Sequence, residues 1–200
     1  MTTSLVSRLL EELAGNSKAL KTWLISSKTE QMTRGWTMPN WCENDLKIGH
    51  SDESKIQKIL DIVNGDREPL LLQSLIPMPD YLKDTSSPKD HPNWYEWRLE
   101  NWGCKWDIHE YWTHEPQIEL DWDRKIHYLE LGFDSPWSPP VPAYEKLEKM
   151  GFYIYATYLE GGCDFVGRYT EGTDTCYSLD DVPKEDKELY DYVKSWRAED

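Results

Sequence analysis

Long hydrophobic runs and export signals are absent from this sequence. No stretch of about 18 consecutive apolar residues occurs, which is the length that a membrane-spanning helix needs. The first residues show no basic region followed by an apolar one, so we expect no secretory signal peptide. The sequence therefore predicts a cytoplasmic protein that does not associate with a membrane.

Cysteine is scarce, and the short motifs that identify common active sites do not occur. The four cysteines form no C-x-x-C pair in a chain of 200 residues, which argues for reduced thiols rather than a disulfide framework. Walker loops, Rossmann glycine fingerprints, nucleophile elbows and H-E-x-x-H patterns are missing. His109, Glu110, His114 and Glu115 are neighbours without a recognisable ligand spacing. We therefore expect no metal and no cofactor, assign no catalytic residue, and favour a non-enzymatic role.

Positive charge is in short supply. The chain has 22 Lys and Arg against 37 Asp and Glu, a formal net charge of −15. Residues 1–37 carry five basic and three acidic groups, residues 38–170 carry 13 and 24, and residues 171–200 carry four and ten. A surface this negative repels phosphate groups, which argues against direct nucleic-acid binding and against anionic membranes. It favours a partner with a basic surface.

Tryptophan, by contrast, is abundant. The chain has 11 Trp residues, and aromatic residues make up 13 % of it. Large rings with polar edges must then supply much of the buried surface, and each buried indole N–H needs a hydrogen-bond acceptor. The composition predicts a core that contains an internal hydrogen-bond network.

Residues 1–37 are expected to form a helical N-terminal extension. Leu5, Leu9 and Leu13 lie on one helical stripe, and a second short helix follows Gly15. An amphipathic helix must bury its apolar side on the same chain, on a second copy or on a partner. A homo-oligomer that assembles through residues 1–37 is one of these possibilities.

From residue 38 onward, the periodicity predicts strands separated by helices. Strands are expected at 41–50, 70–76, 106–112, 117–122, 125–133, 152–159, 163–170 and 175–179. Helices are expected at 52–64, 93–103, 142–150 and 183–196, with an irregular proline-rich segment at 134–140. Helices placed between hairpins indicate an α+β fold with an antiparallel sheet and helices on one face. We divide the chain into a helical extension (1–37), an α+β domain (38–170) and an acidic strand and helix extension (171–200).

Five short strings in the central domain resemble one protein family. They are Met38-Pro39-Asn40-Trp41-Cys42-Glu43-Asn44, Pro77-Met78-Pro79, Asn101-Trp102-Gly103-Cys104-Lys105-Trp106-Asp107, Trp137-Ser138-Pro139-Pro140, and Tyr158-Leu159-Glu160 with Phe165-Val166-Gly167. In this order they resemble the YubB-like, ferredoxin-like domain proteins of plasmids and bacteriophages. The resemblance covers about residues 38–170 and implies a ferredoxin-like sheet, a mobile-element origin and the cytoplasm of a host cell. It implies no activity, and Cys104 and Ser135-Pro136 depart from the residues usual in the family.

The same strings supply a candidate binding cluster. They join amide, hydroxyl, carboxylate and ammonium groups to several indole rings, which is the make-up of many ligand pockets. The candidate residues are Asn40, Trp41, Asn44, Asn101, Trp102, Lys105, Trp106, Asp107, Trp137, Ser138, Tyr158 and Glu160. The alternative is architectural, because such groups also fix turns and form buried networks that hold no ligand.

Local expectations follow for four residues. Lys105 and Asp107 are two apart, so on a strand they would share a face and pair, and Lys105 can also lie over a Trp ring. Ser138 is expected to cap the helix that follows it. Cys42 would be a nucleophile only beside a His or a helix N-terminus, and the sequence shows no such pairing.

The leading functional hypothesis is a non-enzymatic acidic protein that binds a host protein. It would occupy a basic groove, for instance on a nucleic-acid-binding or defence factor, and inhibit it. The alternative is a small-ligand or nucleotide-binding module that uses the Trp, Asn and Lys cluster. The surroundings of four residues, Asn40, Asn44, Lys105 and Asp107, discriminate between a ligand site and a structural cluster. An open cleft around them favours chemistry on a ligand, and mutual burial favours a purely architectural role.

Overall fold

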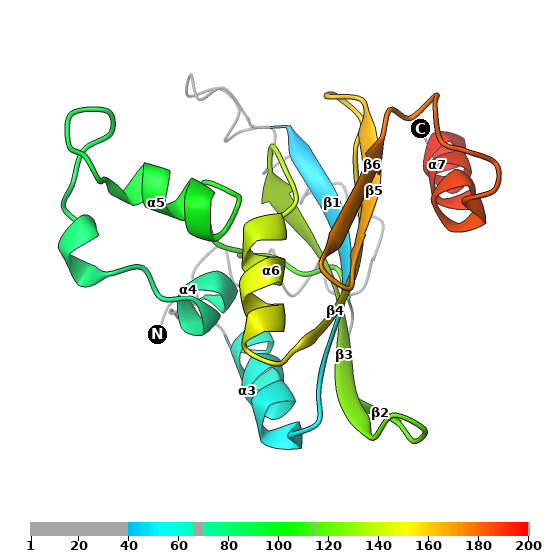
Figure 1. Cartoon of the computed structure of the whole chain (residues 1–200), viewed down its shortest axis with the longest axis horizontal. Coiled ribbons are helices and arrows are strands. Elements are labelled where there is room, and N and C mark those ends of the chain that lie inside the picture. Colours follow the sequence, from blue (N-terminus) through cyan, green and yellow to red (C-terminus); the bar gives the residue numbers. More distant parts are fainter. Residues whose placement is uncertain (1–39, 66–69, 114, 200) are drawn as a thin grey trace, which may run out of the picture. The chain divides into compact units, whose positions relative to one another are not determined.

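A six-stranded antiparallel sheet forms the centre of the described chain, with the strand order β2-β3-β1-β4-β5-β6 (Figure 1). The computed structural model describes residues 40–65, 70–113 and 115–199, all within one compact unit that begins at Asn40. The strands are β1 (Trp41–His50), β2 (Glu119–Asp121), β3 (Ile126–Pro136), β4 (Tyr153–Glu160), β5 (Phe165–Thr170) and β6 (Thr173–Tyr177). The expected helical extension, residues 1–37, lies outside the described residues.

β1 runs between β3 and β4 and shows the period of two that a strand with one face on the core requires. Its even-numbered residues from Cys42 to Ile48 are buried, and its odd-numbered residues from Trp41 to Lys47 are exposed or half-buried. Across the ladder, Leu46 pairs with Leu131, so apolar side chains meet on the buried face. The strand predicted at 41–50 is confirmed with these bounds.

Four α-helices and one 3₁₀ turn lie on the face to which these buried residues point (Figure 1). They are α3 (Glu53–Val63), α4 (Leu71–Leu75), η2 (Asp80–Leu82), α5 (Trp94–Asn101) and α6 (Val141–Lys149). Asp52 caps α3, because its carboxylate accepts the Ser54 backbone N–H at 3.0 Å. Ile56 and Ile59 of α3 and Leu147 of α6 pack in the main core beneath the sheet.

The C-terminal helix α7 (Lys187–Glu199) lies on the opposite face of the sheet (Figure 1). Its residues Leu189 and Val193 pack with Leu159 of β4 and Val166 of β5 in a second, smaller apolar cluster. Residues 171–199 therefore provide an edge strand and a helix that pack directly on the sheet of the central domain.

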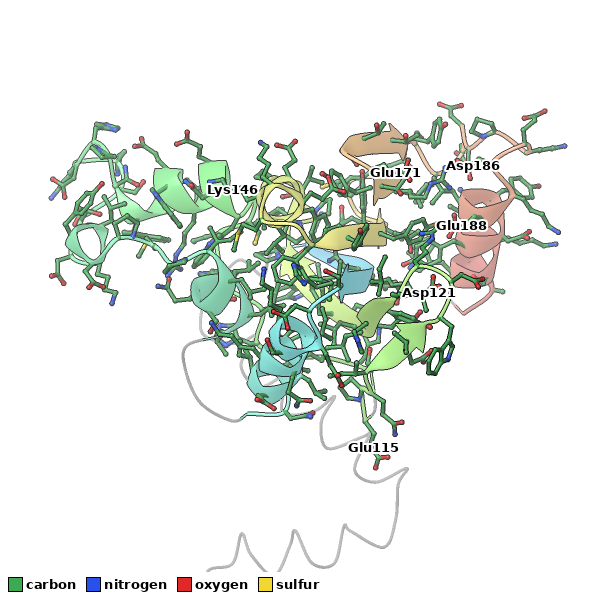
Figure 2. The ribbon with its side chains drawn as sticks, turned by 60° about the horizontal axis from the view of Figure 1, so that its bottom comes forward. Glu115, Asp121, Lys146, Glu171, Asp186 and Glu188 are labelled. Atoms are coloured by element: carbon green, nitrogen blue, oxygen red, sulfur yellow. The ribbon has the colours of Figure 1, made fainter. Side chains whose placement is uncertain are left out.

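An ion-pair network ties the start of α7 to β5. Two guanidinium nitrogens of Arg168 donate to the two carboxylate oxygens of Asp186, at 2.9 and 3.0 Å. Arg168 also bonds Glu188 at 3.0 Å, and the Tyr155 hydroxyl donates to the same Glu188 side chain. Asp186 lies directly before α7 and Glu188 lies in its first turn (Figure 2). The network fixes the first turn of α7 to β5 through charged groups, next to the apolar contact that Leu189 makes.

Two predicted strands are wrong. Residues 71–75, predicted within a strand at 70–76, form α4, because a carboxylate from a distant segment satisfies the first N–H groups of this short helix. Residues 106–112 form only one isolated bridge, Tyr111 to Phe133, because the chain turns at Asp107 to make that cap.

The predicted break at 134–140 begins too early. β3 continues to Pro136, which pairs with Trp41. β2 pairs only with Ile126–Tyr128, so at its far end β3 has a named strand on one side only, where a proline is tolerated.

The α+β class and the antiparallel sheet are confirmed, whereas the strand order does not show a ferredoxin-like topology. The helices between strands cover one face, as expected, and α7 covers part of the other. Within residues 40–65, 70–113 and 115–199, no helix is long and apolar enough to cross a membrane.

Candidate functional site

The separated strings of the candidate cluster come together where β1 begins and β3 ends. The Trp137 N–H donates to the Asn40 carbonyl at 2.9 Å, which joins the first string to the fourth. The Ser138 hydroxyl donates to the Gly103 carbonyl at 2.9 Å, which joins the fourth to the third. The rings of Trp41 and Trp106 also meet, with centroids 6.4 Å apart. Backbone groups and aromatic rings thus make most of the contacts between these sequence strings.

Asn44 is fully buried at the centre of this region. Its amide nitrogen donates to the Cys42 carbonyl at 2.7 Å, to the Ser135 hydroxyl at 2.8 Å and to the Phe133 carbonyl at 3.3 Å. The Ser135 hydroxyl in turn donates a hydrogen bond to the Ser138 carbonyl at 2.8 Å. The Oδ1 atom of Asn44 accepts no hydrogen bond from the described residues. Asn44 therefore ties β1 to β3 and does not reach a surface.

Asp107 is the acceptor that makes α4 possible. Its Oδ1 accepts the backbone N–H groups of Leu72 and Ile108, at 2.7 and 2.8 Å, and its Oδ2 accepts that of Gln73 at 2.8 Å. Leu70, the residue before the helix, offers no side-chain cap of its own. Burial raises the pKa of Asp107, and the three N–H bonds oppose that rise. The predicted Lys105–Asp107 pair does not form, because this carboxylate faces the helix end.

Asn101 and Trp102 fix the end of α5. The Asn101 amide donates to the Trp97 carbonyl at 2.7 Å, and its oxygen accepts from Lys146 of α6 (Figure 2). Trp102 is fully buried, and its indole N–H donates to the Ile76 carbonyl at 2.9 Å. Both side chains hold neighbouring elements together.

Lys105 makes one of its two predicted contacts, whereas Ser138 does not make its predicted helix cap. The Lys105 ammonium lies 4.6 Å from the centre of the Trp106 ring, which is the expected cation–π contact. The predicted cap by Ser138 is wrong, because Pro140 precedes α6 without a side-chain cap bond and the Ser138 hydroxyl bonds Gly103 instead. Gly103 has a φ of 84° and its Cα packs against Pro142, so this corner is closely built.

Tyr158 and Glu160 of β4 are also held internally. The Tyr158 hydroxyl donates to Asp174 of β6 at 2.6 Å, and burial raises the pKa of Tyr158. The buried carboxylate of Glu160 accepts the backbone N–H groups of Gly162, at 2.8 Å, and of Cys163. Glu160 thus shapes the turn between β4 and β5.

The two cysteines within the strings are not poised as nucleophiles. Cys42 and Cys104 are fully buried. Burial raises the pKa of Cys42 strongly and raises that of Cys104 to about 12. A thiol with a raised pKa stays protonated at neutral pH and attacks weakly.

Only the aromatic rim of the cluster meets solvent to a large extent. Trp41 is 44 % exposed and Trp137 is 48 % exposed. Trp137 has a φ of 71°, a left-handed conformation that a bulky residue rarely adopts. At the same corner, the amide nitrogen of Asn40 lies 3.4 Å from the Cys163 sulfur. The cluster therefore combines a closed polar interior with exposed indoles.

Apart from Trp41, the predicted candidate cluster did not include the outer face of the neighbouring strands β1 and β3. We define the β1–β3 face as the residues of β1 and β3 that point away from α3 and α6, namely Trp41, Glu43, Asp45, Lys47, Glu130, Gly132 and Asp134. The polar residues at every second position of β1 were the signal that could have revealed it.

A solvent-open hollow of about 490 Å³ lies away from the cluster, beyond the end of α3. It is lined by Val63, Asn64, Gly65, His109, Tyr111, Thr113, Glu115 and Pro116. Among the described residues, no group of three or more His, Cys, Asp and Glu side chains is arranged to hold a metal ion.

Comparisons with protein-family models, with curated proteins and with solved structures found no significant match to this chain.

Proposed function

We infer that this protein is a non-enzymatic, acidic binding protein that engages a basic surface of another protein. The observation that carries the proposal is that polar side chains of the candidate cluster bond neighbouring side chains or the backbone, while the chain carries a large excess of acidic groups. The groups of the candidate cluster are used in internal bonds, as Asn44, Asp107 and Glu160 illustrate. The unbalanced charge of the chain, 37 acidic against 22 basic groups, supports recognition of a cationic partner.

Exposed indoles strengthen the case for a protein partner. Aromatic residues are enriched where proteins meet, because they bury a large area at a small cost in side-chain entropy. Trp41, Trp112 and Trp137 are each more than two-fifths exposed, and Trp122, at the turn between β2 and β3, is 82 % exposed. A partner that covers such rings gains hydrophobic contact in addition to charge attraction.

The proposal is tested by capture of a partner. The full chain is immobilised, incubated with bacterial lysate at low salt and washed with increasing salt, beside an unrelated acidic protein of similar charge. We expect a protein that binds this chain but not the control and that is released as the salt concentration rises. Recovery of nothing specific at low salt contradicts the proposal.

A second candidate is a small-ligand or nucleotide-binding module. The contact of Lys105 with Trp106, whose ring lies 6.4 Å from that of the half-exposed Trp41, favours it, because a cation beside aromatic rings suits a nucleotide, which joins a phosphate to a base that can stack. A thermal-shift screen across a nucleotide panel tests it, and no shift with any member removes it.

The kinship with YubB-like, ferredoxin-like domain proteins, and with it a plasmid or bacteriophage origin and a host partner, remains a proposal. Assembly through residues 1–37 is tested by light scattering on the full chain and on a chain that starts at Met38. An unchanged number of copies per particle rules it out.

A further inference from the structure

The hollow of about 490 Å³ beyond the end of α3 has the volume of a small-ligand site. Two segments that are far apart in the chain line it, namely residues 63–65, where α3 ends, and five residues between 109 and 116, which precede β2. None of the lining residues belongs to the candidate cluster. The hollow is therefore a separate recess, which the proposed protein-binding role does not use.

The segment before β2 runs beside β3 and turns alternate side chains to opposite sides. The N–H of Trp112 donates to the Gly132 carbonyl at 2.9 Å, and the Trp112 ring lies over Gly132. Tyr111 forms a bridge with Phe133 and packs its ring against that core side chain, with centroids 6.3 Å apart. Thr113 shares the side of Tyr111, because successive side chains of an extended segment alternate. Both residues line the hollow beside the end of α3.

The polar side chains of the hollow are not committed to one another, unlike those of the candidate cluster. Within the described part of the chain, no side-chain hydrogen bond or ion pair is made by Asn64, His109, Tyr111 or Glu115. The Thr113 oxygen accepts a backbone N–H of β3 at 2.6 Å, and the hydrogen of this hydroxyl remains as a donor. A ligand can therefore meet several donors and acceptors here without displacing an internal bond.

The charge around the hollow favours a cation. The C-terminal end of an α-helix carries partial negative charge, and the last turn of α3 contains no basic residue to offset it. Glu115, labelled in Figure 2, adds a carboxylate, and no Lys or Arg is among the lining residues. Burial, followed by the negative charge of Asp107, raises the pKa of Tyr111, so its hydroxyl stays neutral. An ammonium group would meet partial and full negative charges here, whereas a phosphate would meet no Lys or Arg.

Apolar groups lie among the polar ones. Val63, Pro116 and the ring of Tyr111 line the same hollow. A short methylene chain can pack on such groups while its charged end stays beside polar ones. We propose that this hollow binds a small protonated alkylamine, which joins one ammonium group to a short methylene chain. The inference goes beyond the proposed protein-binding role and does not depend on it.

The test titrates n-butylamine into the ¹⁵N-labelled full chain at a pH of about 8, where a primary amine is still protonated. Two-dimensional NMR follows the backbone amide signals, and potassium chloride at the same ionic strength is the control for salt effects. We expect saturable shifts centred on Asn64, Gly65 and Thr113, with a dissociation constant of about 1–10 mM for so few ligand atoms. The neutral analogue 1-butanol should bind at least about tenfold more weakly, because it lacks the charge.

Two matched pairs of variants locate the site. Glu115→Gln removes the carboxylate of the hollow, and Glu171→Gln removes an exposed one that lies far from it in Figure 2. We expect a loss of affinity of about two- to fivefold for the first and of less than about 1.5-fold for the second. Tyr111→Phe keeps the ring on the core and removes the hydroxyl, with a loss of about two- to fivefold, whereas Tyr190→Phe on α7 should change nothing. Circular dichroism checks that each variant is folded.

Shifts spread evenly over the acidic surface, or equal affinities within both matched pairs, overturn the inference, because attraction to net charge alone would then explain binding. Absence of saturable shifts, or equal binding of 1-butanol, overturns it as well. Where the inference holds, Nα-acetyl-lysine N-methylamide identifies the source of the ammonium. Tighter binding than that of butylamine assigns the hollow to a lysine side chain of a partner, and equal or weaker binding assigns it to a free amine.

Discussion

Replacement of Asp107 by alanine should destabilise the fold although Asp107 was predicted to be a binding residue. The change leaves three backbone N–H groups, those of Leu72, Gln73 and Ile108, without their acceptor. A hydrogen bond to a charged group contributes about 1.5–3 kcal/mol. The raised pKa of Asp107 shows that desolvation offsets part of this gain. We therefore expect the free energy of unfolding to fall by about 2–4 kcal/mol.

Two further variants make this prediction specific. Asp107→Asn keeps one carbonyl oxygen for Leu72 and Ile108 but turns an NH₂ group toward the Gln73 N–H, so its loss should be about half as large. Glu100→Ala removes an exposed carboxylate from α5 and should leave the stability unchanged. Urea denaturation followed by circular dichroism measures all three.

The pH dependence of the same group has a definite sign. Its folded pKa lies above the ordinary value, so protonation favours the folded chain. The contribution of Asp107 should not weaken as the pH falls from about 7 to about 5. A loss below about 0.5 kcal/mol for Asp107→Ala, or equal losses for it and for Glu100→Ala, would refute the reasoning.

Three other outcomes follow from the geometry. Arg168→Met should lower the free energy of unfolding by about 1–3 kcal/mol and speed amide hydrogen exchange in α7, because the pair with Asp186 is largely buried. The hydrogen bond from Arg168 lowers the pKa of Asp186. This stabilisation is therefore present above the ordinary pKa of about 4 and is lost as the pH falls through the lower folded value. Amide exchange in α7 should not show that acid dependence in Arg168→Met. Iodoacetamide should modify the exposed Cys163 and leave the buried Cys42 and Cys104 unmodified in the folded chain, as mass spectrometry of tryptic peptides can show.

Elements with strong local signals were predictable. The alternation from Trp41 to His50 fixed β1, and Asp52 marked the start of α3. The requirement that buried indoles find acceptors is confirmed by Trp102, whose N–H bonds the Ile76 carbonyl. These features depend on residues close together in the chain or on a rule that holds for every buried Trp.

Elements that depend on distant partners were not predictable. The apolar run at 70–76 suits a strand as well as a helix, and only Asp107, some 35 positions away, decides between them. The face on which α7 packs is likewise set by contacts with Leu159 and Val166 and not by its own stripe. The β1–β3 face was missed because its acidic residues come from two strands, which only the register of the sheet brings together.

The strand order has a consequence for how this protein can associate. The sheet is open, so β2 and β6 are edge strands whose free backbone groups could pair with another chain. β2 has only three residues and ends at Asp121, and β6 has five and carries Asp174. Short, charged edges resist the addition of a further strand. Growth of the sheet by edge pairing is therefore disfavoured at the described edges, and association through side chains on its faces is the route left open.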